Sequence, residues 1–140
     1  MAETALEALY TAVKRRLTEN AELWGDRVSP DVAPSSTERP HVVYAWAGGG
    51  EVNGLVKPDA VIVLMVQCYA ETQAQAFAAS ARLSVLLNDA DGSSDRALDG
   101  GADWDILNTQ QEGIIHIVET VDSTWVYREG HRFRISMEHK

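Results

Sequence analysis

The stretch AVIVLMVQCY, residues Ala60 to Tyr69, decides the fold class of this chain. Its apolar side chains stand at odd and even positions alike, whereas a strand with one wet face alternates apolar and polar residues. We therefore predict a strand that is covered on both faces. Two helices in so short a chain can cover one face of a sheet, which leaves the other face to a loop or to another subunit.

The segment after this strand predicts a helix that packs closely on the sheet. Thr72 and Gln75 have the spacing of a capping box, and the alanine-rich run that follows continues to about Asn88. Small residues allow a helix to approach a sheet closely, so we expect this helix to be largely buried. The inward candidates on its apolar positions are Phe77, Ala78, Ala81, Val85 and Leu86.

The segment before this strand predicts a helix, an extended arm and a second strand. Thr4 and Glu7 mark a capping box, and an apolar stripe at helical spacing follows. Three prolines between Ser29 and Pro40 disfavour helix and central strand and predict an extended arm. The segment 41–46 (HVVYAW) reads as a strand, and the glycines of 48–54 predict a flexible, hairpin-like connection.

The C-terminal third predicts two further strands. Residues 113–121 (GIIHIVETV) read as a long strand, which Asp122 and Ser123 interrupt and which Trp125 and Tyr127 resume. Residues 131–138 alternate, with Phe133, Ile135 and Met137 on one face and polar residues on the other. The fold class is therefore α+β: one domain over residues 1–140, with a single mostly antiparallel β-sheet of about four strands and two α-helices packed on one face.

Composition limits the function classes. The 140 residues carry a net charge of −9, which disfavours sequence-specific binding to nucleic acid. No apolar run is long enough for a membrane span, and no secretory signal opens the chain, so we expect a soluble protein made in the cytoplasm. The single cysteine, Cys68, is expected to be buried. The four tryptophans are expected in the core rather than at interfaces: Trp24, Trp46, Trp104 and Trp125.

The most unusual segment is acidic. It contains a single basic residue, Arg96, and six aspartates: Asp89, Asp91, Asp95, Asp99, Asp103 and Asp105. A calcium loop is disfavoured, because Ser94 and Gly100 stand where the turn glycine and the bidentate glutamate belong. A solvated acidic loop is the favoured interpretation.

Signatures of catalysis are missing from the sequence. Gly49 and Gly54 have the spacing of a phosphate loop, but Leu55 and Val56 occupy the positions of its Lys and Ser/Thr. The four histidines lack metal-ligand spacing, and His116, between Ile115 and Ile117, is expected to be a hydrogen-bonded core or interface residue. We predict no enzyme activity, no catalytic residues, no metal and no cofactor.

The layout as a whole resembles the tail terminator, or tail completion, family of tailed bacteriophages. The resemblance includes the opening helix, WGDRVSPDVAP leading through prolines to RPHVVYAW, the strand that runs directly into a helix, and the closing IIHIVETVDSTWVYREGHRFRISME. It implies a subunit of a homohexameric ring at the head-proximal end of the virion tail. Such a ring ends polymerisation of the major tail tube protein and presents a surface to the head-completion or neck protein, while DNA passes through the lumen without specific binding.

The resemblance and the sequence patterns together suggest three sets of contact residues. The candidate subunit interface is Val61, Val63, Met65, Arg132 and Arg134. The candidate tube or neck contacts are Pro30, Pro34, Pro40, Gly48, Gly49, Gly50, Glu51 and Asn53. The aspartates of the acidic segment are candidates for the lumen of the ring, with an outer solvated loop as the alternative.

Two other functions stay open at this point. A head-closure or neck connector protein can have similar size and acidity. A small ligand-binding or enzymatic α+β domain belongs to a different class, because a fold of this kind does not dictate function.

Overall fold

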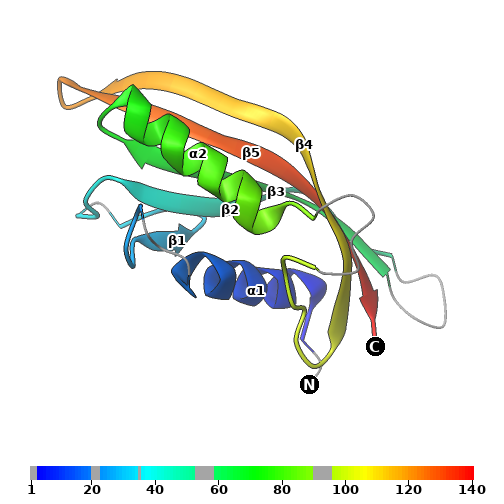
Figure 1. The fold of residues 1–140 in the computed structure, drawn as a ribbon. Helices are drawn as coiled ribbons and strands as arrows, with labels where there is room; N and C mark the ends of the chain where they lie inside the picture. The colour runs from blue at the N-terminus through cyan, green and yellow to red at the C-terminus, as the bar shows by residue number, and fades with distance from the viewer. Residues whose placement is uncertain (1–2, 20–22, 35, 53–58, 90–95) are drawn as a thin grey trace.

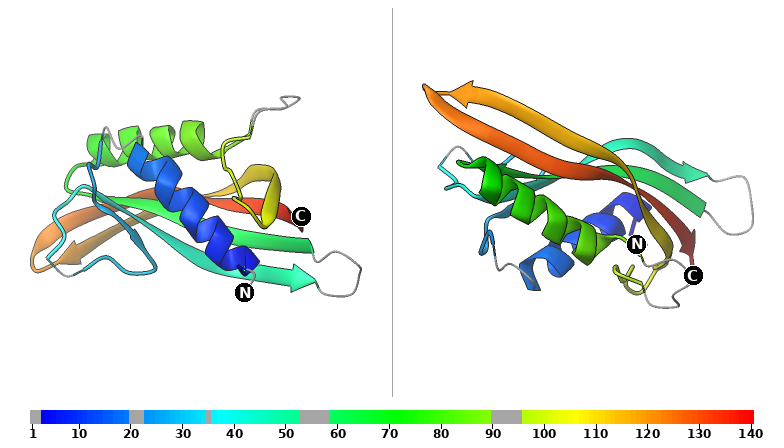
Figure 2. Two further views of the ribbon diagram at one scale, coloured as in Figure 1. Left: turned by 90° about the horizontal axis from the view of Figure 1, so that it is seen from below. Right: turned by 45° about the horizontal axis from the view of Figure 1, so that its top comes forward.

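A computed structural model describes residues 3–19, 23–34, 36–52, 59–89 and 96–140, shown in Figure 1. The elements in chain order are α1 (Ala5–Glu19), β1 (Val28–Pro30), β2 (His41–Val52), β3 (Asp59–Ala70), α2 (Gln73–Leu87), β4 (Trp104–Val121) and β5 (Thr124–His139). The strands form one sheet in the order β1-β2-β3-β5-β4. Both helices lie on the same face of the sheet, as the views in Figure 2 also show.

The α+β prediction with a single sheet is confirmed, and the expected number of about four strands is close to the observed five. The additional strand is β1, which pairs in parallel with β2 over only three residues. All other neighbouring strands pair antiparallel. The sheet is therefore mixed, with a short parallel edge strand formed by part of the predicted arm.

The central strand β3 separates the two faces of the sheet. Its even-numbered residues from Ala60 to Ala70 are all buried under the helices. They pack against inward residues of β5 such as Phe133, Ile135 and Met137, as the alternating pattern of that strand predicts. Cys68 belongs to this core, and burial raises the pKa of its thiol to about 12.

The two helices begin where the capping residues predict. Thr72 accepts a hydrogen bond from the backbone N–H of Gln75 at 3.2 Å, and Thr4 accepts one from that of Glu7 at the same distance. The predicted stripe of α1 faces the core, with Leu9, Val13 and Leu17 buried and with partly buried residues beside them: Leu6 and Tyr10.

The prediction of which face of α2 points to the core is wrong. The buried residues are Ala76, Ala79, Ser80, Leu83, Leu86 and Leu87. Of the predicted inward residues only Leu86 is buried, whereas Phe77, Ala78, Ala81 and Val85 are exposed. Alanine occurs on both sides of this helix, so its hydrophobic pattern does not select a face, and an apolar stripe is left facing outward.

Two further predictions need correction. Gly48, Gly49, Gly50 and Glu51 continue strand β2 after a bulge between Trp46 and Gly48, so they do not form a loop. The end of the acidic segment belongs to a strand, because β4 begins at Trp104 and includes Asp105. Asn53, Asp91 and Asp95 lie outside the described residues.

Candidate interaction surfaces

The predicted subunit-interface residues lie together on the face of the sheet that the helices leave uncovered. In the register of β3 and β5, Val63 is opposite Arg134 and Met65 is opposite Arg132. Val61 is 39% exposed and both arginines are exposed, while Val63 is buried between its neighbours. Arg134 forms an ion pair with Glu112 on β4 at 2.8 Å. We call these residues the open sheet face: Val61, Val63, Met65, Arg132 and Arg134.

Part of the proline-rich segment lies across one end of the same face of the sheet. A groove of about 300 Å³ runs between Val32, Ala33 and Pro34 on one side and Tyr69 and Val126 on the other. Among the predicted contact residues, Pro30 and Pro34 are exposed. Pro40 is buried, so its side chain is not available for a partner. The second face of β3 is thus covered in part by a loop and is open elsewhere.

The predicted contacts in the glycine-rich segment have mixed positions. Gly49 and Gly50 are exposed and Gly48 is half-buried. The carboxylate of Glu51 accepts a hydrogen bond from the backbone N–H of Ala5 at 2.7 Å. Glu51 therefore satisfies a free donor at the start of α1, which is a structural role within the subunit.

The acidic segment divides into a buried aspartate and a group near the chain termini. Asp89 is buried, and its carboxylate accepts hydrogen bonds from the backbone N–H groups of Ala97 and Thr109, both at 2.8 Å. Asp103 accepts a hydrogen bond from the backbone N–H of Glu3, and Asp105 lies 3.6 Å from the ammonium group of Lys140. Asp89 therefore holds its own segment against β4, while Asp99 and Asp105 are exposed.

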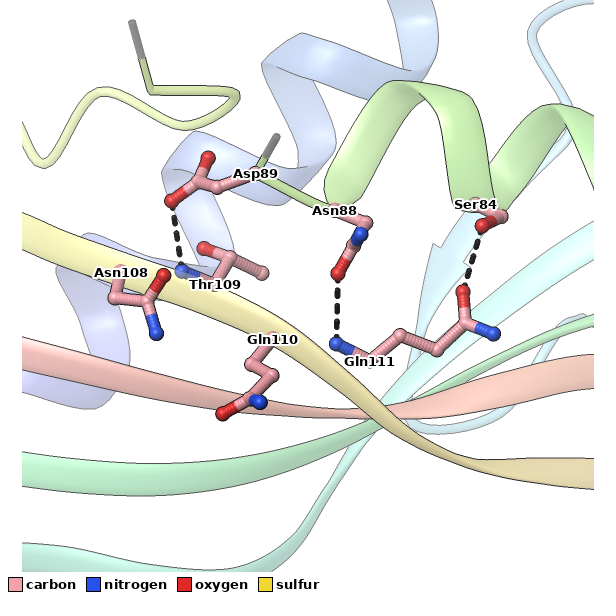
Figure 3. A pocket seen from close by; sticks show the side chains of 7 residues that line it. All are labelled: Ser84, Asn88, Asp89, Asn108, Thr109, Gln110 and Gln111. Atoms are coloured by element: carbon pink, nitrogen blue, oxygen red, sulfur yellow. Dashed lines mark hydrogen bonds between the residues drawn. The ribbon is translucent and has the colours of Figure 1, made fainter. Parts of the chain in front are cut away.

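A polar pocket of about 420 Å³ lies where α2 ends beside β4, as Figure 3 shows. Asn88 accepts a hydrogen bond from the backbone N–H of Gln111, and Ser84 donates one to the side-chain oxygen of Gln111. Together with Asp89 on Thr109, these contacts occupy the outer edge of β4 around residues 109–111. Side chains that satisfy a strand edge prevent another strand from pairing there, so this pocket protects the edge.

Two histidines on the helix side of β4 and β5 carry the remaining polar contacts. His131 Nε2 lies 3.0 Å from the hydroxyl of Ser80, but both residues are more than nine-tenths buried, so a substrate cannot reach the pair. His116 is hydrogen-bonded to Glu129 and its side chain is half exposed, so it is not the core residue that was one of the two expectations. Phe77 of α2 stacks on His116, with 6.2 Å between the ring centroids.

One group of exposed apolar side chains was not predicted. Ile114 and Val118 stand on the same side of β4 as His116 and Gln111, facing the flank of α2. Their exposed fractions are 74% and 44%, and those of Phe77 and Val85 on α2 are 49% and 66%. With Ala81, which is also exposed, these residues form a surface that we call the α2–β4 patch: Phe77, Ala81, Val85, Ile114 and Val118.

The tryptophans divide between core and surface. Trp24 and Trp104 are buried, as expected. Trp46 and Trp125 are 51% and 60% exposed, which contradicts the expectation that all four lie in the core. Trp125 sits beside the turn that joins β4 to β5, and Trp46 lies on β2, towards the other edge of the sheet.

Comparison with known proteins gives a fold likeness. The sequence matches no family model and no curated protein. The structure is similar to a chain of a solved structure described as the virion of a native gene transfer agent (GTA) particle, with a TM-score of 0.65 and 20% sequence identity. The match covers 98% of this chain and 99% of that chain, so it includes every element of the fold.

Two features are absent from the part of the chain that the structure describes. None of its helices combines the length and the apolar character that crossing a membrane requires. Within the same ranges, no cluster of three or more His, Cys, Asp or Glu side chains has a geometry that could hold a metal ion.

Proposed function

We propose that this protein is a structural subunit of a phage-like virion, and that it caps the tail tube as a tail terminator. The observation that carries the proposal is the end-to-end fold likeness to a chain of a virion particle. The sequence resemblance to the tail terminator family supports the same function. The uncovered apolar side chains of the open sheet face and of the α2–β4 patch support a role in assembly, because exposed apolar patches mark interaction sites.

In this proposal the protein acts through its surfaces and has no reaction to catalyse. Copies of the chain form a ring on the finished tube, so no further tube subunit can be added. The opposite side of the ring receives the head-completion or neck protein. The net charge of −9 suits a ring through which DNA moves without adhering, because like charges repel.

The test is removal of the gene from a phage-like element that carries it, followed by electron microscopy of the particles. Loss of a tail terminator gives overlong tubes without heads. Loss of a head-closure or neck protein, the alternative within the structural class, gives tails of normal length beside leaking heads. Particles with normal tails and filled, attached heads would reject both.

A further inference from the structure

The outer edge of the sheet at β4 is closed over one part of its length and open over another. At residues 109 to 111 it is closed, because Asp89 and Asn88 accept hydrogen bonds from the backbone N–H groups that point outward there. Along residues 113 to 121, no hydrogen bond from the described part of the chain reaches the outer edge. Figures 1 and 2 show no described segment that continues the sheet beyond β4. This second half of β4 is therefore an unpaired strand edge.

The opposite edge of the sheet carries devices that prevent pairing with another strand. β1 has only three residues, and one of them, Pro30, has no backbone N–H group to donate. The carbonyl group of Val28 in β1 accepts a hydrogen bond from the ammonium group of Lys14. Residues 113 to 121 of β4 contain neither proline nor lysine, so they lack this kind of protection.

The pairing of β4 with β5 identifies the backbone groups that the open edge presents. The outward N–H groups at residues 109 and 111 belong to residues that lie opposite odd-numbered residues of β5. Outward and inward residues alternate along an antiparallel pair, so the later residues opposite odd-numbered residues of β5 also point outward. These residues are Ile114, His116, Val118 and Thr120. Each of the four presents an N–H and a C=O group to a neighbouring strand.

The side chains along this edge are mostly apolar and carry little charge. Ile114, Ile117 and Val118 are 74%, 39% and 44% exposed. Glu119 is the only acidic residue between positions 113 and 121, and it lies 3.6 Å from the guanidinium group of Arg128 in the same subunit. An exposed apolar edge strand of this kind is a template for pairing with a strand of another chain.

The open edge is complementary to a second copy of itself. When two copies run antiparallel with Ile117 opposite Ile117, Ile114 lies opposite Thr120 and His116 lies opposite Val118. All four outward residues then pair with one another, and no charged side chain lies opposite a like charge. Centring the pair on His116 or on Val118 instead leaves one outward residue of each copy without such a partner. The hydrogen-bonding pattern therefore selects one register.

The same arrangement covers the exposed flank of α2. A two-fold axis that joins two strand edges antiparallel is perpendicular to the sheet, so the helices of both copies lie on the same side of the joined sheet. The flanks that carry Phe77 and Val85, which are 49% and 66% exposed, then face each other across the two β4 strands. A second copy thus supplies backbone partners for the edge and an apolar cover for the helix flank beside it.

We propose that two copies of this chain pair through residues 113 to 121 of β4, antiparallel about Ile117, and join two five-stranded sheets into one. The contact is isologous, because both subunits use the same surface, and it closes on itself. It leaves no open β4 edge on which a further strand could add. The inference goes beyond the proposed function, since a closed pair does not by itself build a ring.

The test is disulfide cross-linking of variants with one added cysteine, under mild oxidation and with detection in a non-reducing denaturing gel. In the proposed register the two copies of residue 117 form a non-hydrogen-bonded pair, with their Cα atoms about 4.5 Å apart. Cysteines at this separation can form a disulfide bond. Ile117→Cys is therefore expected to give a covalent dimer. The natural Cys68 is buried and does not take part.

Two further variants test the register. Ile115→Cys alone and Glu119→Cys alone are expected to stay monomeric in the gel, because residue 115 of one copy lies opposite residue 119 of the other. An equimolar mixture of these two variants is expected to give dimers. Equal cross-linking of Ile115→Cys and Ile117→Cys would show a contact without this register and would overturn the inference.

A proline separates backbone pairing from a contact between side chains alone. The N–H group of Val118 points outward, so Val118→Pro removes a donor from the edge and leaves the hydrogen bonds between β4 and β5 in place. Added to Ile117→Cys, it is expected to reduce cross-linking to the level of Ile115→Cys, whereas Val118→Ala in the same background retains it. Circular dichroism checks that the proline variant is folded.

Two results would reject the proposed pair. Unchanged cross-linking in the folded proline variant would show that the strands do not pair through their backbones. Failure of Ile117→Cys to give any covalent dimer would show that the two edges do not meet.

The outcomes for the pair and for the proposed function are separate. Dimers in this register, together with normal tails and heads after removal of the gene, would support the pair and reject the function. Overlong tubes after removal of the gene, without cross-linking of Ile117→Cys, would support the function and reject the pair.

Discussion

Gly49 is a single residue on which the course of β2 depends. Its φ of +79° is a conformation that other residues rarely adopt, and a Cβ at this position would lie 2.0 Å from the carbonyl oxygen of Val61 on β3. We predict that Gly49→Ala lowers the free energy of unfolding by more than about 2 kcal/mol, through backbone strain and this overlap. Urea denaturation measures the change.

The neighbouring glycine provides the matched control. Gly48 has no atom within 4 Å of a Cβ built on it, so Gly48→Ala is expected to leave the urea midpoint almost unchanged. Equal loss of stability in both variants would contradict the assignment of the effect to Gly49 itself.

Cys68 gives a second prediction at this scale. The thiolate is the reactive form, and burial raises the pKa of this thiol to about 12, so almost none of it is ionised near neutral pH. We expect no reaction with a thiol reagent in native buffer and full reaction in denaturing urea, followed by absorbance. Fast labelling of the native protein would contradict the burial of β3 beneath the helices.

Asp89 links three elements at the next scale. Its carboxylate accepts two backbone hydrogen bonds, from Ala97 and from Thr109 on β4, and it directly follows the end of α2. Asp89→Ala leaves both donors without this partner, one of them in buried surroundings, which costs about 2 to 3 kcal/mol of unfolding free energy. Denaturant unfolding of the variant tests the value.

A neighbouring aspartate provides a control that separates the loss of the Asp89 hydrogen bonds from the loss of one negative charge. Asp99 is exposed, and its carboxylate accepts a hydrogen bond from the exposed backbone N–H of Gly101 at 2.9 Å. Asp99→Ala removes the same charge, but water can replace the lost partner, so we expect a much smaller loss of stability than in Asp89→Ala. If the two variants unfold alike, Asp89 does not have the structural role that its contacts indicate.

Comparison of the elements with their sequence patterns shows where sequence reasoning succeeds. β3 and the second half of β5 are predicted well, because one is apolar throughout and the other alternates. Trp125 and Tyr127, which were assigned to the preceding strand, belong to β5, because Asp122 and Ser123 form the turn between β4 and β5. Both helix starts are predicted, because capping depends on local residues such as Thr72. These features are set by contacts within a few residues of each other.

The wrong predictions concern elements whose position depends on contacts between residues far apart in the sequence. In α2, alanines stand on every side, so the buried face is chosen by contacts such as Ser80 with His131, 51 residues away. Gly48 to Glu51 resemble a loop, yet pairing with Val63 to Ala60 extends the strand through them. The α2–β4 patch was missed for the first of these reasons, since its members on α2 were predicted to face the core.

At the scale of the whole molecule, the exposed acidic residues remain candidates for the lumen of the ring. Asp99 and Asp105 are exposed and Asp103 is partly exposed, whereas Asp89 is buried. Among the described residues, the candidates for the lumen are therefore Asp99, Asp103 and Asp105. If these residues line the lumen, changing all three to Asn is expected to slow DNA ejection, because loss of repulsion lets DNA adhere. Unchanged ejection and infectivity would place them on the outer surface.

The dependence of assembly on salt follows from the kind of contact that joins the subunits. The side chains of the α2–β4 patch are apolar, and sulfate strengthens apolar association, whereas salt in general screens ion pairs at a surface. We therefore predict that the mass of the assembly, measured by sedimentation, is maintained or increased in about 1 M sulfate. If the α2–β4 patch forms subunit contacts of the proposed ring, Ile114→Asp is expected to reduce the assembly to the monomer in the same buffer, because a charge then enters an apolar contact. Val32→Asp places the same charge on an apolar side chain that is 79% exposed and outside the α2–β4 patch, so its assembly should match the parent. Loss of assembly of the parent protein in sulfate would mean that ion pairs, rather than apolar contacts, hold the subunits together.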